Sequence, residues 1–421
     1  MDRTVSDVPT LSSIEEIGLD MFDAEAISRP HRFYALLRER APIVWSEQTR
    51  AWVLTRYEDV KRVLRDHETF SSARGEVRRI DRQGGVQPEQ VAPPGTLNML
   101  GADRPDHTRL RTLLRQDFIP SRISRWQPRI EQICDETLQI ASSGDSYDVV
   151  KGIAEPLPVT VIAEMLGIPS ELGHQFKRWS DAAIEPVAPT ATDADVLARN
   201  SLVVEFRNYL QARINERRYA PTEDLIGRLV AAGDEGSLTD AEVLAAVNLL
   251  LLAGNETTTN LISNAVLALA LQPDKQHELR QNPELIEQAV EEFLRYDGSV
   301  QYTTRIVTTP QTFHGQTVPE GDAVIVSIAS ANRDPRVFEN PDVLNFNRPI
   351  GPNRHIGFGD WIHICLGQFL ARIETRAALR ALLAEFDTFE LACQPEDVPY
   401  RRNFNLRGPR YLPIREIGRS G

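Results

Sequence analysis

The sequence is poor in cysteine and has no long apolar run. Its 421 residues contain three cysteines, Cys134, Cys365 and Cys393, and a number so small and odd does not provide the disulfide framework of a secreted domain. No stretch reaches the ~18 consecutive apolar residues that a membrane helix needs. The N-terminus lacks the basic and then apolar order of a signal peptide. We therefore expect a soluble, cytoplasmic protein with no membrane partner.

Positive charge is also in deficit. Lysine and arginine number 47 against 60 aspartates and glutamates, which gives a net charge of −13. A nucleic-acid surface needs concentrated cations, so we expect no nucleic-acid partner. The composition is 41% hydrophobic and 25% charged, which is typical of a globular protein and excludes disorder, collagen and coiled coil. A chain of this length buries ~70–75% of its unfolded surface, enough to enclose a cofactor in a dry interior.

Helical periodicity dominates the chain, and short strand signals interrupt it. We expect a mainly α fold with a small β portion in one domain over residues 1–421, of which about 1–25 form a poorly ordered extension. The expected helices cover 29–39, 57–65, most of 106–218, 239–271, 284–296 and 366–386, and the expected strands lie at 43–45, 51–54 and within 300–328.

Three segments lack a regular pattern. Residues 72–100 are rich in glycine, proline and polar side chains, and so long a loop is more often a functional lid than a connector. A proline-rich break at 184–192 joins two helices. Residues 332–354 are rich in proline, asparagine and aspartate, and we expect irregular structure there.

The helix expected at 239–271 is the longest apolar stretch. Thr239 and Glu242 have the spacing of a capping box, in which each side chain binds the backbone N–H of the other residue. Residues 247–253 are apolar nearly all round, which predicts a helix buried through the centre of the fold.

Cys365 differs from the other two cysteines in its position. It directly precedes a long helix, whose free N–H groups and positive dipole end favour a thiolate, lower the thiol pKa and make the sulfur a metal ligand. Gly367 lets a flat cofactor approach the helix, and Phe358 shields the sulfur from water. We expect Cys134 and Cys393 to be inert, small hydrophobic residues.

The segment around Cys365 resembles the haem-binding loop of the cytochrome P450 superfamily, Phe-Gly-x-Gly-x-His/Arg-x-Cys-x-Gly. Phe358, Gly359, His363, Cys365 and Gly367 match this pattern. The resemblance implies the P450 fold, with haem b between the central helix and the cysteine loop, and Cys365 as the iron ligand.

One position of the loop departs from the family. Trp361 stands where the family has a glycine that permits positive φ, a conformation that costs energy for tryptophan. A dinucleotide-binding loop at residues 357–362 is the competing interpretation, but the third glycine and a surrounding βαβ unit are missing.

Glu292 and Arg295 lie three residues apart on the helix expected at 284–296. Alone, such a pair can be an ordinary surface ion pair. In the P450 family the corresponding pair is buried and joined by an arginine from the irregular segment before the cysteine, which here is Arg348. The resemblance implies a structural role for the three residues, since a buried triad needs every charge paired.

The central helix contains the sequence Ala-Gly-Asn-Glu-Thr-Thr at 253–258. A glycine in a helix interior costs ~1 kcal/mol relative to alanine, and an acid among leucines needs a partner. Alone, the segment can be a kink with a hydroxyl bonded to the preceding turn. It matches the P450 pattern at every position, which implies that Ala253 and Gly254 leave a groove for dioxygen, and that Glu256 and Thr257 deliver protons to it.

Four cations correspond to the family residues that hold the two haem propionates. Arginine suits bidentate contact with a carboxylate. These residues are His107, Arg111, Arg305 and His363.

The resemblance implies a bacterial-type monooxygenase that uses O2 to hydroxylate a compact, mainly apolar small molecule. Three alternatives stay open: an unusual oxidation such as ring coupling or demethylation, a peroxide-driven enzyme, and a non-catalytic haem-thiolate sensor. The last two have little use for the Glu256 and Thr257 pair.

We expect an aliphatic substrate pocket, with the alternative that a basic loop captures a substrate carboxylate. The expected pocket residues are Leu249, Leu252, Ala253, Val300, Thr303 and Phe404, and the basic loop residues are Arg74, Arg78, Arg79 and Arg82.

We expect electrons to come from a small acidic ferredoxin and its reductase. Because the chain itself is acidic, docking needs a local basic patch on the cysteine side of the haem. Candidates by position are Arg109, Arg115, Arg372 and Arg376.

Overall fold

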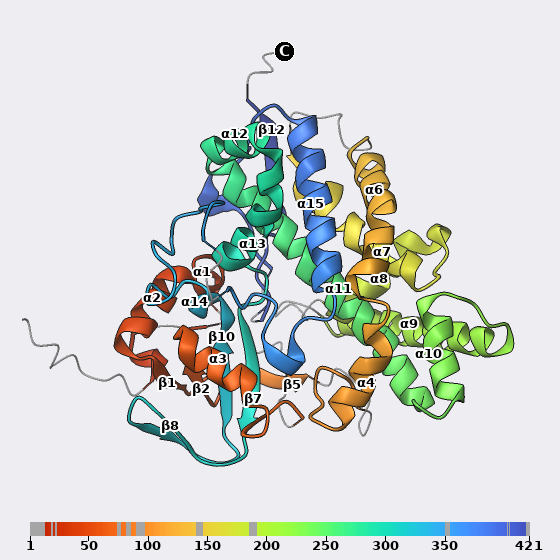
Figure 1. The fold of residues 1–421 in the computed structure, drawn as a ribbon, viewed down its shortest axis with the longest axis horizontal. Helices are drawn as coiled ribbons and strands as arrows, with labels where there is room; N and C mark the ends of the chain where they lie inside the picture. Colours follow the sequence, from red (N-terminus) through yellow and green to blue (C-terminus); the bar gives the residue numbers. More distant parts are fainter. Residues whose placement is uncertain are drawn as a thin grey trace, which may run out of the picture.

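The computed structural model describes residues 13–17, 20–21, 23–73, 77–80, 86–89, 97–139, 146–184, 192–349, 354–401, 403 and 405–417. Most of the predicted elements are present within one or two residues of their predicted bounds, and the fold is mainly helical with small sheets. Figure 1 shows most of the helices at the top and right of the view and the main sheet at the lower left.

The helices are α1 (Ala24–Ser28), α2 (His31–Arg40), α3 (Tyr57–Arg65), α4 (Asp106–Arg115), α5 (Pro120–Ile123), α6 (Gln127–Gln139), α7 (Pro156–Met165), α8 (Gly173–Ile184), α9 (Asp193–Tyr219), α10 (Leu225–Asp234), α11 (Asp240–Ala270), α12 (Pro273–Gln281), α13 (Ile286–Asp297), α14 (Ile328–Ala331) and α15 (Gln368–Glu385). The strands are β1 (Ile43–Ser46), β2 (Ala51–Leu54), β3 (Phe70–Ser71), β4 (Val77–Ile80), β5 (Val86–Glu89), β6 (Tyr147–Asp148), β7 (Tyr302–Val307), β8 (Gln311–Phe313), β9 (Gln316–Val318), β10 (Ala323–Ser327), β11 (Phe389–Leu391) and β12 (Pro413–Glu416).

The main sheet has five strands in the order β1-β2-β10-β7-β3. All five residues of β10 are buried, as expected for a continuous apolar run in a central strand. It pairs in parallel with β2 and antiparallel with β7, where Val324 lies opposite Arg305. This register places Arg305 in the middle of the sheet.

The long helix α11 crosses the centre of the fold, as predicted. The Thr239 hydroxyl accepts a hydrogen bond from the Glu242 amide at 3.2 Å, and the Glu242 carboxylate accepts one from the Thr239 amide at 2.8 Å. Helices α7, α13 and α15 pack against α11, and buried residues lie on all its sides. In the part of the chain that the structure describes, no helix is both long and apolar enough to cross a membrane.

The prediction of a structureless loop over residues 72–100 was wrong. Strands β4 and β5 form an antiparallel hairpin inside this segment, with Val77 opposite Glu89 and Ile80 opposite Val86. Residues 185–191 of the predicted proline-rich break lie outside the described residues. The described residues 332–349 and 354 contain neither helix nor strand, as predicted.

Of the segment 1–25, the structure describes a few short pieces. Ser13 forms a bridge with Trp45, and Ile14 is fully buried in a small core under the sheet. The expectation of an extension over about 1–25 otherwise falls outside the described residues, and the single domain stays a prediction.

Candidate functional site

The loop that carries Cys365 has a fixed backbone. The Cys365 amide donates to the Phe358 carbonyl at 2.8 Å, and the Gly359 amide donates to the Ile356 carbonyl at 2.8 Å. The loop is attached to α3 because the Asp360 carboxylate pairs with Arg65 at 2.8 Å. Gly359 has a φ of 73°, which glycine adopts without steric cost.

Trp361 keeps the backbone shape that a glycine would take. Its φ is 57° and its side chain is 55% exposed. A left-handed conformation costs an L-residue about 1–2 kcal/mol. The departure from the family motif therefore leaves the loop with the positive φ that the family glycine permits, and it places an indole on the surface.

Burial dominates the electrostatics of the Cys365 thiol. Burial raises the pKa of the thiol. The Gly367 amide and the guanidinium groups of Arg111 and Arg372 lower it, but their combined effect is smaller. The prediction of a net lowering was therefore wrong, since the desolvation of a thiolate outweighs one amide and two cations. A metal ion reverses this balance, because a coordinating thiol is deprotonated outright.

The other two cysteines have no comparable surroundings. Cys134 is 1% exposed in the main core, and burial raises its pKa to about 12. Burial and the Asp397 charge also raise the pKa of Cys393.

A short stretch in the middle of α11 is open although most of the helix is buried. Ala253 is exposed and Gly254 and Thr257 are half-buried, whereas Asn255, Glu256 and Thr258 beside them are buried. Residues 253, 254 and 257 share one helix face. The open face marks the segment that the family pattern assigns to dioxygen.

Two glycines face free space. A Cβ atom built on Gly254 in α11, or on Gly367 before α15, meets no heavy atom within 4 Å. Since α11 and α15 pack against each other, these backbones leave room for a flat group. Phe358 lies nearby, half-buried beneath the Arg372 guanidinium at 4.5 Å.

The acid and alcohol of α11 each have a defined contact. The Thr257 hydroxyl donates to the Ala253 carbonyl at 2.7 Å. The Asn403 amide donates to the buried Glu256 carboxylate at 3.4 Å. Thr258 instead contacts Glu374 on α15. Burial raises the pKa of the Glu374 carboxyl to about 8, and the hydrogen bond from Thr258 opposes this rise.

The structure brings the four predicted cations to one side of the Cys365 loop. The His107 and His363 rings lie 4.2 Å apart, and the Arg111 Nη2 atom donates to the Ile364 carbonyl at 2.6 Å. Arg305 is 7% exposed, and its side chain donates, among the residues that the structure describes, only to Thr303 and Thr304, its neighbours on β7. We name His107, Arg111, Arg305 and His363 the cation cluster.

No acid among the described residues forms an ion pair with the cation cluster. Burial, the first cause, lowers the pKa of Arg305 to about 10, of His107 to about 4 and of His363 to about 2, and neighbouring cations lower both histidines further. Among the described residues, Arg305 forms no ion pair and the buried His107 Nε2 atom has no hydrogen-bond partner. Asp103 raises the pKa of Arg305 and His107, but its carboxylate is bound by Ser71 and Ser72.

These features fit a flat group with two carboxylates and a metal ion. The backbones at Gly254 and Gly367 leave room for its plane, the cation cluster matches two carboxylates, and Cys365 supplies a sulfur ligand. The unpaired charge of the buried Arg305 is costly, and a carboxylate of a bound group would offset that cost and favour the protonated form of the two histidines. The residues present therefore fit haem.

The predicted triad is also brought together. Arg295 binds both Glu292 oxygens at 2.7 and 2.8 Å, and Arg348 binds the same carboxylate at 3.0 and 3.2 Å. The exposed fractions of the three side chains are 4% for Glu292, 2% for Arg295 and 14% for Arg348. Asn345 adds its amide at 2.9 Å, and Arg295 binds the carbonyls of Asn332 and Pro341. The triad therefore attaches the segment before the cysteine loop to α13.

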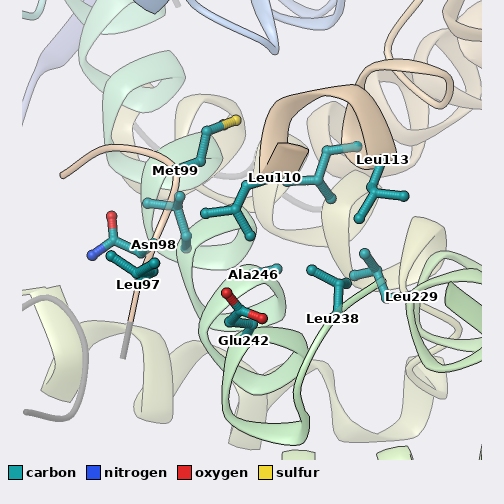
Figure 2. A pocket seen from close by; sticks show the side chains of 11 residues that line it. Leu97, Asn98, Met99, Leu110, Leu113, Leu229, Leu238, Glu242 and Ala246 are labelled. Carbon is teal, nitrogen blue, oxygen red and sulfur yellow. The ribbon is translucent and has the colours of Figure 1, made fainter. Parts of the chain in front are cut away.

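The predicted pocket residues are divided between two places. Figure 2 shows a narrow, mainly apolar cavity between residues 97–99, α4, α10 and α11, and Leu249 lines it together with Ala246. Leu252 and Ala253 follow on α11, half-buried and exposed respectively. Val300 and Thr303 lie at β7, where Val300 bridges to Leu406.

Several predicted substrate contacts fall outside the description. Phe404, Arg74 and Arg82 lie outside the described residues, and the side chains of Arg78 and Arg79 on β4 are not described.

The predicted basic patch does not form as a set of free cations. Arg109 pairs with Glu242 at 2.6 Å, Arg372 pairs with Glu291 at 2.5 and 2.9 Å, and Arg376 pairs with Glu287. Of the four arginines, Arg115 alone is exposed without an ion pair in the described part of the chain. Three of the four arginines are therefore already ion-paired within the chain, and the docking patch stays a prediction.

Sequence reasoning missed two polar contacts of the site. The Ser72 hydroxyl lies 3.1 Å from His363 Nε2, and Asn403 contacts Glu256. Ser72 stands in the segment expected to be a lid and Asn403 near the C-terminus, and neither is part of a motif, so the sequence carried no signal for them.

Three comparisons relate the chain to known proteins. The family model "Cytochrome P450" matches residues 197–409. The polyketide biosynthesis cytochrome P450 PksS of Bacillus subtilis (strain 168) is 38% identical over 396 residues, which cover 91% of this chain and 95% of the relative. Nocardicin C N-oxygenase of Nocardia uniformis subsp. tsuyamanensis is 41% identical over 392 residues, with coverage of 91% and 95%. The crystal structure of CYP109E1 from Bacillus megaterium in complex with testosterone superposes with a TM-score of 0.80 at 33% identity, covering 94% of this chain and 100% of that chain.

Proposed function

The chain belongs to the cytochrome P450 family of oxidoreductases, and we propose that it uses O2 to hydroxylate a compact, mainly apolar small molecule. The open face at Ala253, Gly254 and Thr257 on the mostly buried α11 carries this proposal. A helix buried all round would serve packing alone, whereas an open acid–alcohol segment suits controlled proton delivery.

Haem b is the proposed cofactor, with Cys365 as the iron ligand. His107, Arg111, Arg305 and His363 would hold its carboxylates, and Gly254 and Gly367 would leave room for its plane. When bound, the haem supplies the binding and reductive cleavage of dioxygen, and a thiolate ligand favours that cleavage.

Thr257 is the proposed proton-handling group nearest the open face. Its hydroxyl donates to the Ala253 carbonyl, so its lone pairs are free to accept a hydrogen bond from water in the site. Threonine in a helix divides between two χ1 rotamers because of this backbone bond. Rotation out of the bond frees the hydroxyl proton for donation.

Glu256 is the proposed proton source behind Thr257. Its carboxylate is buried, and the Asn403 amide holds one of its oxygens. A carboxyl group next to the threonine can pass protons inward, and it can be recharged through water from the surface. This acid–alcohol pair favours an O2-driven reaction over the peroxide-driven and sensor alternatives, while ring coupling or demethylation stays open.

The proposed substrate contacts are Leu249, Leu252 and Ala253 on α11, with Val300 and Thr303 from the β7 side and Phe404. An apolar lining selects substrates by shape, and each methylene group that fits the pocket contributes about 1–3 kcal/mol to the discrimination. The relatives named above are a cytochrome P450 of polyketide biosynthesis, nocardicin C N-oxygenase, and CYP109E1 in complex with testosterone. Their names point to different substrates, so family membership does not select the substrate. We further propose a ferredoxin-type electron donor and a cytoplasmic location.

The proposed function is tested by the amount of product formed per O2 consumed. Candidate substrates are first selected by the shift of the haem Soret band on binding. Thr257→Ala should keep that shift but lower the yield several-fold and release hydrogen peroxide instead. Thr258→Val is the matched control, since Thr258 contacts Glu374, and it should keep the wild-type yield. Full coupling in Thr257→Ala would contradict the proposed role.

A further inference from the structure

The polar side chains of α11 continue beyond the segment at 253–258. Glu256, Asn260 and Asn264 follow one another every fourth residue, so they lie on one face of the helix. All three are buried, although residues of these types are mostly exposed in proteins. A polar face therefore extends for two buried turns from the proposed proton source.

A segment near the C-terminus lies against this polar face. The Asn403 amide donates to the Glu256 carboxylate at 3.4 Å. One turn further along α11, the Asn260 amide lies so close to Gly408 that a Cβ atom at residue 408 would clash with its oxygen. We name the interface between this face of α11 and residues 403–408 the polar seam.

Several polar atoms in and beside the polar seam lack a partner. Asn260 is 0% exposed, and neither atom of its amide forms a hydrogen bond with any described residue. The Asn264 carbonyl oxygen and the Ser299 hydroxyl are likewise buried and unpaired within the described parts of the chain. Ser299 lies beside the seam because its carbonyl accepts from the Arg407 amide at 2.8 Å. Leaving such atoms unsatisfied is costly, and in proteins ordered water commonly satisfies them.

The polar seam also leads toward the surface. The Asn264 amide donates to the carbonyls of Asp297 at 3.0 Å and Arg407 at 3.1 Å. The Asp297 carboxylate lies 3.4 Å from His31 Nε2, and the His31 side chain is 23% exposed. The unpaired atoms therefore lie between Glu256 and a partly exposed histidine.

We propose that Asn260 positions a chain of buried water molecules in the polar seam, and that these waters return protons to Glu256 from the side of His31. This inference rests on the proposed function, because only a Glu256 that gives up protons needs them returned. Each water passes one proton toward Glu256 and takes one from the water behind it, so the chain of waters is unchanged and one proton leaves the solvent. Asn260 acts as a positioning residue, since its amide can both donate to and accept from water.

A crystal structure of the haem-loaded wild-type protein tests the proposed waters directly. It should show an ordered water within hydrogen-bond distance of the Asn260 amide, with further waters toward Glu256 and Asn264. A dry seam, in which the Asn260 amide is bound by protein groups alone, would overturn the inference.

The role of these waters is tested by Asn260→Leu, which replaces the amide with an apolar side chain of similar size. With a substrate selected by its Soret shift, the variant should lower kcat by roughly 5-fold or more at an unchanged KM. The solvent deuterium isotope effect on kcat should rise at least about twofold, because proton return then limits turnover. Asn260→Ser keeps a polar group and leaves room for one more water, so it should restore most of the rate.

Asn255→Leu is the matched control. Asn255 is also a buried asparagine of α11, but its amide donates to the Ser180 hydroxyl at 2.7 Å. This variant should keep the wild-type isotope effect, and all variants should keep the substrate-induced Soret shift and the rate of reduction by dithionite.

A wild-type kcat and isotope effect in Asn260→Leu would overturn the inference, and so would equal changes in Asn260→Leu and Asn255→Leu. Failure of the proposed function is a separate result, because it would appear as full coupling in Thr257→Ala whatever water the polar seam holds.

Discussion

Two groups of buried cations in this protein differ in what neutralises them. In the triad, Arg295 and Arg348 share the Glu292 carboxylate, and the carbonyls of neighbouring segments take up the remaining N–H groups. In the cation cluster, Arg305 is also buried, but within the described parts of the chain its side chain binds only a hydroxyl and a carbonyl of its own strand. The triad is complete within the chain, whereas the cation cluster fits the carboxylates of the proposed haem. Burial of charge thus distinguishes a structural site from a binding site.

The largest expected effect comes from breaking the triad. Glu292→Gln leaves two buried guanidinium groups without their acid, and removing one partner of a buried pair costs about 3–5 kcal/mol. The free energy of unfolding from urea titration measures this loss. As a control, Glu396→Gln removes the exposed ion pair with Arg29 and should cost less than about 1 kcal/mol. Equal losses in the two variants would show that the triad is not a buried network.

Arg305 should respond in the opposite direction. Burial lowers its pKa to about 10, so the guanidinium is still charged at neutral pH and its burial costs free energy of folding; this cost begins to fall only as the pH rises above about 10. Arg305→Met should therefore not destabilise the haem-free chain, and it can stabilise it by up to about 3 kcal/mol. Urea titration of the haem-free protein measures this change, and a clear loss of stability would contradict the comparison.

The same Arg305→Met variant should lose haem faster. A hydrogen bond to a charged group is worth about 1.5–3 kcal/mol, which corresponds to a roughly 10–100-fold faster transfer of haem to a scavenging apoprotein. Haem dimethyl ester lacks the free carboxylates and is the control. Wild type and Arg305→Met should release the ester at similar rates, and a difference that persists with the ester would place the effect elsewhere.

His107 should give the cluster a smaller, pH-dependent signature. Its pKa is lowered to about 4 by burial and by Arg111 and Arg104, so the unfolded chain gains a proton near pH 6.5 while the folded chain does not. The contribution of the neutral His107 to the free energy of unfolding is therefore fully present above pH 6.5. It decreases as the pH falls, by about 2 kcal/mol between pH 6.5 and 5. Unfolding free energies of the haem-free protein at several pH values measure this slope.

Two variants sharpen that measurement. His107→Gln should reduce the dependence of the unfolding free energy on pH by the amount that corresponds to the uptake of about one proton on unfolding. His277→Gln, at an exposed position, should leave this pH dependence as it is in wild type. Bound haem should also flatten it, since carboxylates next to His107 stabilise its protonated form. An unchanged slope in His107→Gln would show that His107 is not held neutral by burial.

Local patterns predicted the elements well, and they failed where the outcome depended on distant residues. The capping box of Thr239 and Glu242 and the apolar residues 247–253 are local signals, and α11 follows them closely. The hairpin of β4 and β5 was missed because its strands are short and polar. No local pattern could supply Glu242 as a partner of Arg109 or Glu291 as the partner of Arg372, because these acids lie 133 and 81 residues away.

The site shows the same division. The residues of the cation cluster and the triad were identified through the resemblance to the P450 family, and the structure brings them together from separate elements. The pKa of Cys365 was predicted in the wrong direction because the depth of burial depends on the whole fold. Trp361 was recognised as a departure, but its positive φ and its exposure became visible only in three dimensions.

The most direct measurement of the account's central claim is the spectrum of the reduced, CO-bound protein. Cys365→Ser should abolish the long-wavelength Soret band that a thiolate ligand produces, because no other sulfur lies in this loop. Cys134→Ser, at a core cysteine whose pKa burial raises, should keep the band in full. A thiolate band that survives Cys365→Ser, or that is lost in Cys134→Ser while the fold is retained, would contradict the assignment of Cys365 as the haem ligand.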